Sequence, residues 1–235
     1  MRHAISTAFV VLAWALAPPA TAQTEERGVP IVNAPFHVPV FTNDYITLLN
    51  VNVPPGRNTG YHIHSSDSVS VNIEAAEMTN QNLGSTDVSA PARGERGRAT
   101  FANYSKEGMR THKASNVGPT PFHTISFILR HPGPDGTMPS SRVGVSGYTQ
   151  IMDNQRVRGW RVVVEPGQST GQITQQAPGI RIVLDGGVLA ELLPGRAERG
   201  MSPRSGDVLW QEPGTTRAVR NTGTTRIEFV EFELK

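Results

Sequence analysis

Three histidines of this chain have a spacing that suits a metal ion. His62 and His64 are two residues apart, and side chains at i and i+2 of a β-strand point to the same face, so both imidazoles can reach one point. His112 lies far along the chain, just before the apolar run Phe122–Leu129. Imidazoles from separate strands can hold one divalent metal and leave coordination positions open. The pattern therefore predicts a metal site at His62, His64 and His112, the alternative being hydrogen-bonded histidines without a ligand.

These histidines belong to one copy of an internal repeat. Residues 43–74 realign at a constant offset of 111, which places Pro55-Gly56 on Pro166-Gly167, and further along an offset of 105 places Asn116 on Asn221. At these offsets the three histidines fall on Ile173, Gln175 and Arg217. We therefore expect one metal per chain and none in the second copy. Glu228 is the carboxylate expected to pair with Arg217.

The elements that must position the histidines are short strands. Runs rich in Val, Ile, Thr and aromatic residues alternate with Gly, Pro, Asn and Asp, which is typical of all-β proteins, and no stretch has a convincing helical period. The clearest runs are Tyr45–Val53, Val69–Ile73, Phe122–Leu129, Trp160–Val164, Ile180–Leu184 and Arg226–Glu233. The repeat predicts two β domains, residues 23–130 and 153–235, joined by a linker over residues 131–152 that is rich in turn formers.

The first 22 residues have the features of an export signal. Arg2 precedes an apolar run, and Ala20-Thr21-Ala22 forms a small-x-small cleavage site. The apolar run is too short for a spanning helix. We expect signal cleavage near Ala22, a mature chain that begins at Gln23 in the periplasm or outside the cell, and no membrane association of that mature form.

The composition narrows the partners and the ligands. The chain has 22 basic and 20 acidic residues and a formal charge of +2, so nucleic acid is not an expected partner. It has no cysteine, which excludes thiolate ligands and disulfides and leaves histidine and carboxylate as the strong metal ligands. A small molecule is the expected partner, and the oligomeric state stays open, a homodimer included.

Both halves resemble the cupin superfamily. The first cupin motif has Gly, five residues and then His-x-His, and Gly56 with His62-Ile63-His64 matches it. The second motif ends in His-x-x-x-Asn, which His112 and Asn116 match. The second copy keeps the frame of the second motif, Pro213-Gly214-x-x-Arg217-x-x-x-Asn221, with arginine at the place of the histidine.

The resemblance implies an all-β fold of two tandem cupin β-barrels, of the double-stranded β-helix or jelly-roll type, with very little helix. The chain is similar to exported bacterial cupin-domain proteins that have no assigned substrate. The first barrel is expected to bind metal, and the second is expected to be degenerate.

One ligand of the cupin motif is missing. Many cupins have a glutamate that is separated from His-x-His by three or four intervening residues, and these spacings fall on Ser68 and Val69 in this chain. We expect Val69 to be the counterpart, because Val69, Val71 and Ile73 resemble the inward series of a barrel strand. Asp67 either moves in from the turn as a fourth ligand or, as we expect, is a solvated loop aspartate.

Other candidate residues are His123, Tyr61, His37 and His131. His123 shares a strand face with the apolar residues of Phe122–Leu129, so we expect it to point into the first barrel, either as an acid–base residue and a possible catalytic group or as a core histidine. Tyr61 is expected to pack on the outside, while His37 and His131 lie in Pro-rich flanks and are expected to face solvent.

The functional expectation follows from the open metal positions. The resemblance implies a three-histidine site like that of the cupin thiol and diketone dioxygenases, holding iron, manganese or zinc. Oxygen activation by iron is favoured over carbonyl polarisation by zinc or manganese. The competing hypothesis is a non-catalytic cupin that binds a small ligand or has a structural role.

Overall fold

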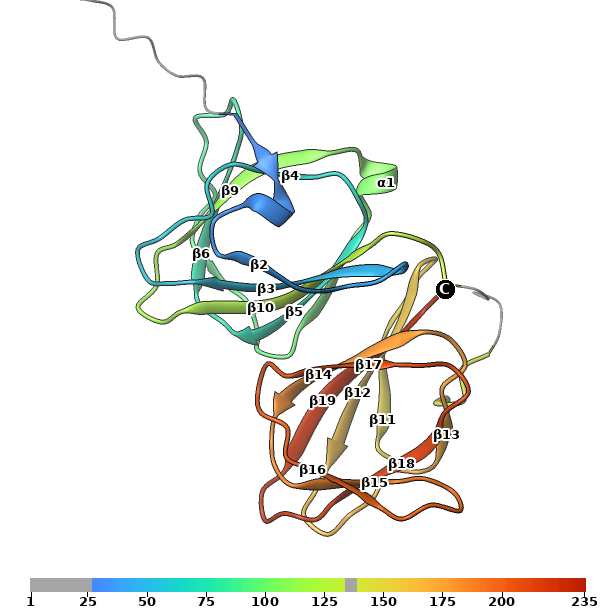
Figure 1. Cartoon of the computed structure of the whole chain (residues 1–235). Coiled ribbons are helices and arrows are strands. Elements are labelled where there is room, and N and C mark those ends of the chain that lie inside the picture. Colours follow the sequence, from blue (N-terminus) through green and yellow to red (C-terminus); the bar gives the residue numbers. More distant parts are fainter. Residues whose placement is uncertain (1–26, 134–138) are drawn as a thin grey trace, which may run out of the picture.

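The computed structural model describes residues 27–133 and 139–235. They form two β-barrels, the first drawn from blue to green and the second from yellow to red in Figure 1. The helices are a 3-10 turn η1 (Ile31–Asn33) and a single turn α1 (Tyr104–Glu107), so the all-β expectation is confirmed for this part of the chain. None of the described helices has the length and apolar character needed to cross a bilayer. The expected signal peptide lies outside the described residues.

The first barrel consists of two five-stranded sheets. In spatial order, one sheet contains β1 (Val29–Pro30), β4 (His62–His64), β9 (Arg110–Asn116), β6 (Glu77–Asn82) and β7 (Ala92–Arg93). The other contains β2 (His37–Thr42), β3 (Ile46–Val53), β10 (Phe122–Leu129), β5 (Ser68–Glu74) and β8 (Ala99–Ala102). All pairings are antiparallel except that of β1 with β4.

The second barrel repeats this plan. Its five-stranded sheet contains β11 (Tyr148–Asp153), β12 (Val157–Val164), β19 (Ile227–Leu234), β14 (Gly179–Asp185) and β17 (Val208–Gln211). Its four-stranded sheet contains β13 (Ile173–Thr174), β18 (Thr216–Asn221), β15 (Leu189–Leu192) and β16 (Arg199–Met201). The repeat seen in the sequence is thus a repeat of whole barrels.

Two short motifs explain why the copies fold alike. Gly56 and Gly167 have φ of 70° and 76°, the left-handed region that a Pro-Gly turn requires and glycine adopts without strain. Asn116 accepts from the backbone N–H of Gly118 and donates its amide to Val53 and Thr120. Asn221 makes the corresponding three bonds in the second barrel. These side chains bind the end of one strand to the start of the next.

The barrels pack sheet against sheet, and this contact corrects an expectation. Val69, on β5, belongs to an apolar cluster between the barrels, where Phe127 and Phe232 meet with ring centroids 5.2 Å apart. The first barrel contributes Ile46, Leu48, Val69, Val71, Ile73, Ile125, Phe127 and Leu129. The second contributes Val157, Ile180, Ile182, Leu184, Val230, Phe232 and Leu234. The expectation that Val69, Val71 and Ile73 point inward is therefore wrong, because this face of the sheet is buried by the second barrel.

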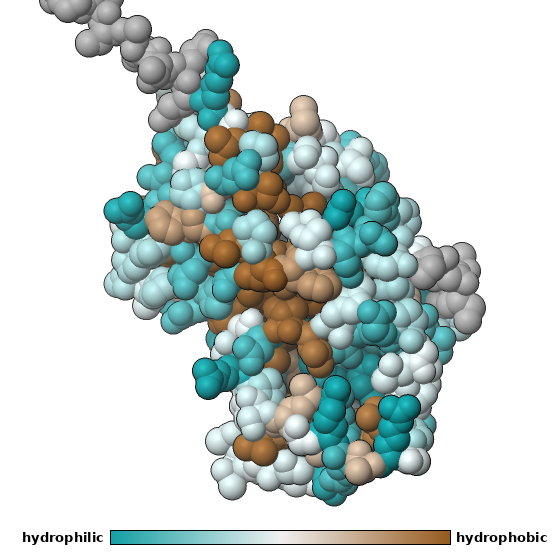
Figure 2. Space-filling view, viewed as in Figure 1, coloured by the Kyte–Doolittle hydropathy of each residue, from teal (hydrophilic) through white to brown (hydrophobic). Residues whose placement is uncertain are grey.

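Apolar side chains also mark the seam on the surface. Figure 2 shows them as a brown band that runs down this face from the first barrel to the second. At the seam Trp210 contacts Phe41 and Tyr45, with ring centroids 5.8 and 6.2 Å apart. Aromatic side chains of the two barrels thus contact one another along the seam.

The expected linker over residues 131–152 is too long at its C-terminal end. β11 (Tyr148–Asp153) pairs with β12 as an edge strand of the second barrel. Arg142 is only 1% exposed and bonds residues inside that barrel. The second barrel therefore begins before residue 153, within the segment that contains Arg142.

Candidate metal centre

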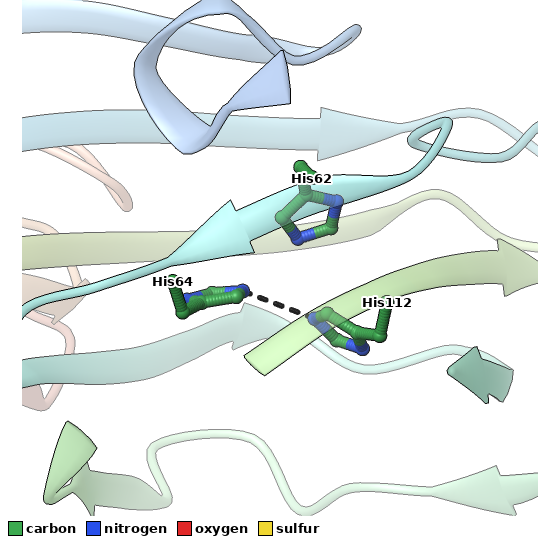
Figure 3. A group of neighbouring side chains, drawn as sticks. All are labelled: His62, His64 and His112. Carbon is green, nitrogen blue, oxygen red and sulfur yellow. Dashed lines mark hydrogen bonds between the residues drawn. The ribbon is translucent and has the colours of Figure 1, made fainter. Parts of the chain in front are cut away.

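The sheet register brings the three predicted histidines together. His62 and His64 lie on β4, and His62 is directly opposite His112 on the antiparallel neighbour β9. One ring nitrogen from each of the three lies within 4.8 Å of the others, and Figure 3 shows the rings turned toward a common point. The prediction of convergent imidazoles is confirmed by this geometry.

Hydrogen bonds orient two of the rings. Nδ1 of His62 lies 3.1 Å from the carbonyl oxygen of Gly60, and Nδ1 of His112 lies 2.9 Å from Oδ1 of Asn80 on β6. Both oxygens are acceptors, so each Nδ1 carries a proton and each Nε2 offers a lone pair. Such hydrogen bonds fix the orientation and tautomer of metal-binding histidines.

The nitrogen spacing fits a metal ion. Nε2 of His64 and Nε2 of His112 are 3.0 Å apart, the contact drawn as a dashed line in Figure 3. Two imidazole nitrogens bound at about 2.1 Å lie about 3 Å apart when they subtend a right angle at the ion. The pair is therefore spaced as two adjacent ligands of an octahedral ion would be.

Burial keeps the imidazoles neutral. It lowers the pKa of His62 to about 4, although the Gly60 carbonyl opposes the shift. It lowers the pKa of His64 to about 3 and that of His112 to about 2, and the positive charges of Arg110 and the neighbouring histidines lower both further. Neutral imidazole is the form that binds a metal, so no proton need leave at neutral pH.

The histidines border a cavity of about 270 Å³ inside the first barrel. Its wall includes the hydroxyl groups of Thr59, Ser70, Thr124 and Ser126 and the amides of Asn72 and Asn80. Apolar groups complete it, among them Ile31, Val51, Met78 and Phe122. Apart from histidines, the described residues that line it carry no ionisable side chain. A second depression, of about 360 Å³, borders His64 and contains Ser68 and Met109.

Two aromatic residues beside the cluster were not anticipated. His37 lies with its ring centroid 4.9 Å from that of His62 and lines the same cavity, so its expected solvent-facing position is wrong. The sequence contained an indication of this position. The repeat offset places His37 on Tyr148, which is half-buried in the second barrel. The ring of Tyr104 of α1 lies tilted against that of His64, with centroids 4.9 Å apart. The ring nitrogens of His37 are not part of the convergent set.

The missing glutamate position is Ser68. Ser70 and Asn72 line the cavity, and strand alternation places Ser68 on their face and Val69 on the opposite face. Asp67 does not occupy the fourth position either. It is 2% exposed, contrary to the expected solvated loop role, and its carboxylate accepts hydrogen bonds from Ser105 and Arg156.

The remaining candidates lie outside the cluster. His123 was expected to point into the barrel, but it faces the seam, where Nε2 lies 2.9 Å from Oδ1 of Asn50 and the ring borders Gly206 of the second barrel. Tyr61 packs under the ammonium group of Lys113, consistent with its expected outer position. His131 is exposed, as expected.

The second barrel holds different groups at the corresponding places. Ile173 pairs with Arg217 across β13 and β18, as His62 pairs with His112. Gln175 Oε1 lies 3.2 Å from Nη2 of Arg217, which parallels the contact between His64 and His112. The predicted equivalence of the three positions is thus confirmed, and no cluster of metal-binding side chains is found among the described residues of this barrel.

Arginine and glutamate fill the interior of the second barrel. Glu231 is fully buried and accepts hydrogen bonds from Arg142 at 2.7 Å, Arg181 at 2.9 Å and Arg217 at 3.2 Å. Burial alone would raise the pKa of Glu231, but the three arginines lower it well below the ordinary range. At the offset of 105, Glu231 corresponds to Ser126 of the first cavity. An ionic network therefore occupies the space that is a cavity in the first barrel.

The expected partner of Arg217 was wrong. Glu228 lies on the other face of β19, where it pairs with Arg161 and Arg226. Residues 228 and 231 are three apart and point to opposite faces of a strand. The network partner of Arg217 is Glu231 because its side chain shares the inner face.

Comparison with known proteins gives structural relatives alone. No model of a protein family matches the chain, and no curated protein matches it. Among solved structures, a cupin 2 conserved barrel domain protein from Leptotrichia buccalis has a TM-score of 0.51 and 8% identity, covering 85% of this chain and 88% of that one.

Two bacterial enzymes match similarly. Salicylate 1,2-dioxygenase from Pseudaminobacter salicylatoxidans has a TM-score of 0.53 and 12% identity, with 81% and 71% of the two chains covered. Oxalate decarboxylase from Bacillus subtilis, a protein with Mn(II) centres, has a TM-score of 0.53 and 12% identity, with 81% and 69% covered. At such identities the similarity establishes a shared two-barrel fold.

Proposed function

We propose that this chain, a two-domain protein of the cupin fold, binds one divalent metal ion through His62, His64 and His112 and acts as a non-haem metal-dependent dioxygenase on a small molecule. The observation that carries the proposal is the convergence of three neutral imidazoles on a cavity whose described lining has no ionisable side chain other than histidine. The second barrel, whose corresponding positions are taken by a buried ionic network, has no metal in this proposal.

In this proposal the residues of the first barrel have distinct roles in metal binding. Nε2 atoms of the three histidines would hold the ion, while Gly60 and Asn80 fix the rings that bind it. A bound iron would supply oxygen activation, and a bound zinc or manganese would supply Lewis-acid polarisation of a carbonyl. Because neither Ser68 nor Asp67 supplies a carboxylate to the site, coordination positions remain for a substrate.

The lining of the cavity indicates the substrate class. Neutral ligands leave the full charge of the cation to attract an anionic or enolate-like group. The hydroxyl groups of Ser70 and Ser126, 2.9 Å apart, can donate to or accept from polar atoms of a ligand. Phe122 and Met78 offer apolar contacts to its body. A small carboxylate or enolate with an apolar part fits these features.

The names of the two matched enzymes support this choice. Both salicylate and oxalate, which appear in those names, are small carboxylates. The support concerns the fold and the class of ligand. At 12% identity, individual residues of this chain are not matched to residues of those enzymes.

The test is metal analysis followed by oxygen uptake. The full chain is loaded anaerobically with Fe(II), Mn(II) or Zn(II) and then mixed with thiol, diketone, phenolic and hydroxybenzoate compounds in air-saturated buffer. We expect oxygen consumption with one class and with iron, and none for the His112→Ala variant. Metal binding with saturable ligand binding but no oxygen uptake would instead support the non-catalytic alternative.

We also propose that the protein is exported, on the pattern of its first 22 residues. Cell fractionation and N-terminal sequencing test this. We expect a mature chain in the periplasm or the medium that begins at Gln23; an intact N-terminus in the cytoplasm would contradict it.

A further inference from the structure

Asp67, three residues after His64, is a buried carboxylate at the seam between the barrels. Its side chain is 1% exposed. Oδ1 accepts from the backbone N–H of Ser105 at 2.8 Å, and Oδ2 accepts from the hydroxyl of Ser105 at 2.9 Å and from Nη1 of Arg156 at 3.1 Å. The carboxylate therefore joins the first barrel, helix α1 and the second barrel.

Helix α1 holds an aromatic ring against the metal centre. It consists of Tyr104–Glu107, a single turn that is too short to be stable without tertiary contacts. Ser105, its second residue, makes two of the bonds to Asp67. The ring of Tyr104, the preceding residue, lies against that of His64 with centroids 4.9 Å apart and a tilt of 31° between the planes. The bonds of Ser105 therefore help to position Tyr104, whose hydroxyl also forms a hydrogen bond with Arg110.

Arg156 reaches this site from a fixed turn of the second barrel. Oδ1 of Asn154 accepts from the backbone N–H groups of Arg156 and Val157 at 2.9 and 3.0 Å. Asn43 forms the same turn in the first barrel, where Tyr45 stands at the place of Arg156. The turn is thus common to both copies, and the guanidinium group is present only in the second.

We propose that Arg156 is a positioning residue for the metal centre of the other barrel. By pairing with Asp67 it fixes Ser105, and through α1 it holds Tyr104 against His64, so that the orientation of one metal ligand depends on the docked second barrel. The inference rests on the proposed metal binding and assigns a role to the barrel that has no metal site of its own.

A purely structural role for the ion pair is the alternative, and the chain offers a matched control. Arg96 of the first barrel pairs with Asp185 of the second at 2.9 Å, with side chains 42% and 40% exposed. This second ion pair also joins the barrels, and Arg96 donates its hydrogen bonds to Leu184 and Asp185 of the second barrel, not to the histidine cluster. Because the apolar interface between the barrels is extensive, we expect the barrels to stay docked when either pair is removed.

The experiment is a Co(II) titration of the full chain, followed by calorimetry and by the visible absorption spectrum of the bound ion. Arg156→Ala is expected to weaken Co(II) binding about tenfold, the lower end of the effect of groups that orient metal ligands, and to alter the spectrum. Arg156→Lys should restore part of the affinity. Arg96→Ala should bind Co(II) with the affinity and spectrum of the natural chain.

Tyr104 provides a second, independent variant. Tyr104→Phe keeps the ring that packs against His64 and should leave affinity and spectrum unchanged, whereas Tyr104→Ala should reproduce the effect of Arg156→Ala. The double variant Arg156→Ala/Tyr104→Ala should be no weaker than either single variant, because both act through the same contact.

The outcomes separate this inference from the proposed function. If the natural chain binds no Co(II), the proposed metal site is wrong. If it binds Co(II) and Arg156→Ala and Tyr104→Ala both bind it unchanged, the positioning role is wrong and the metal site stands. Should Arg156→Ala fail to fold by circular dichroism, the pair Tyr104→Ala and Tyr104→Phe decides the question.

Discussion

Nε2 of His64 and Nε2 of His112 lie 3.0 Å apart, although the residues are 48 positions apart in the chain. Nδ1 of His112 donates to Asn80, so Nε2 of His112 carries a lone pair, and a neutral His64 protonated on Nε2 donates a hydrogen bond to it. When the proton of His64 is on Nδ1 instead, both Nε2 lone pairs are directed at the same point. In that tautomer a metal ion would bind both nitrogens.

The first prediction concerns metal stoichiometry. The natural chain should bind one divalent ion, and His62→Ala, His64→Ala or His112→Ala should each lower metal content sharply, because each removes one of three protein ligands. Elemental analysis of purified protein measures this. His123→Ala is the control, since His123 faces the seam. Two ions per chain would contradict the assignment of the second barrel.

A second prediction tests the position of the missing glutamate. Ser68→Glu should raise the affinity for Mn(II) at least about tenfold, because it adds a charged ligand beside His64. Val69→Glu should not raise it. That substitution buries a carboxylate in the apolar seam and should lower the free energy of unfolding by about 3 kcal/mol or more. Tighter binding by the Val69 variant would refute the inward assignment of Ser68.

A third prediction concerns the support of His112. Asn80→Ala removes the acceptor of the Nδ1 proton, which frees the ring to rotate. Metal affinity should fall about tenfold or more, as for other groups that orient metal ligands. Isothermal titration calorimetry measures it, with Gln81→Ala on the same strand as the control, because the side-chain amide of Gln81 donates to the carbonyl of Ser85. Equal affinities for the two variants would show that the Asn80 bond has no role in binding.

The fourth prediction addresses the ionic network. Glu231→Gln leaves Arg142, Arg181 and Arg217 without their shared carboxylate, and at neutral pH it should lower the free energy of unfolding by about 3–5 kcal/mol. Because the folded pKa of Glu231 lies below its ordinary value of 4.5, this stabilisation is present above pH 4.5 and is lost as the pH falls toward the folded pKa.

Urea unfolding at several pH values measures this difference. Glu198→Gln, which removes an exposed ion pair with Arg220, is the control and should cost less than about 1 kcal/mol. A difference between the natural chain and Glu231→Gln that is the same at pH 7 and pH 3 would contradict the low folded pKa.

The fifth prediction is that Arg217→His does not create a second metal site. Ile173 supplies no ligand atom, and Gln175 is engaged by Arg142 at 2.5 Å. Metal titration should still saturate at one ion per chain, while unfolding by urea should occur at lower concentration because Glu231 loses a partner. A second bound ion would show that the network rearranges to accept a cation.

The sequence by itself determined the two copies and the grouping of the three histidines. Turn residues such as Gly56 and strand periodicity are local properties, so the repeat, the all-β class and the equivalence of His112 with Arg217 followed from spacing. Two histidines at i and i+2 share a face wherever the strand lies. The antiparallel pairing of β4 with β9 then places His112 beside His62 and His64.

The tertiary structure decided which face of each strand looks inward. One face of β5 is buried by the second barrel and carries the apolar series, whereas the other face carries the polar series and lines the cavity. The sequence pattern alone favoured the reverse, since apolar residues usually mark the interior. The tertiary structure also decided the environment of Asp67, which is buried and paired with Arg156 of the other barrel. Contacts between distant segments have no local signature in the chain, because they depend on how two completed barrels pack.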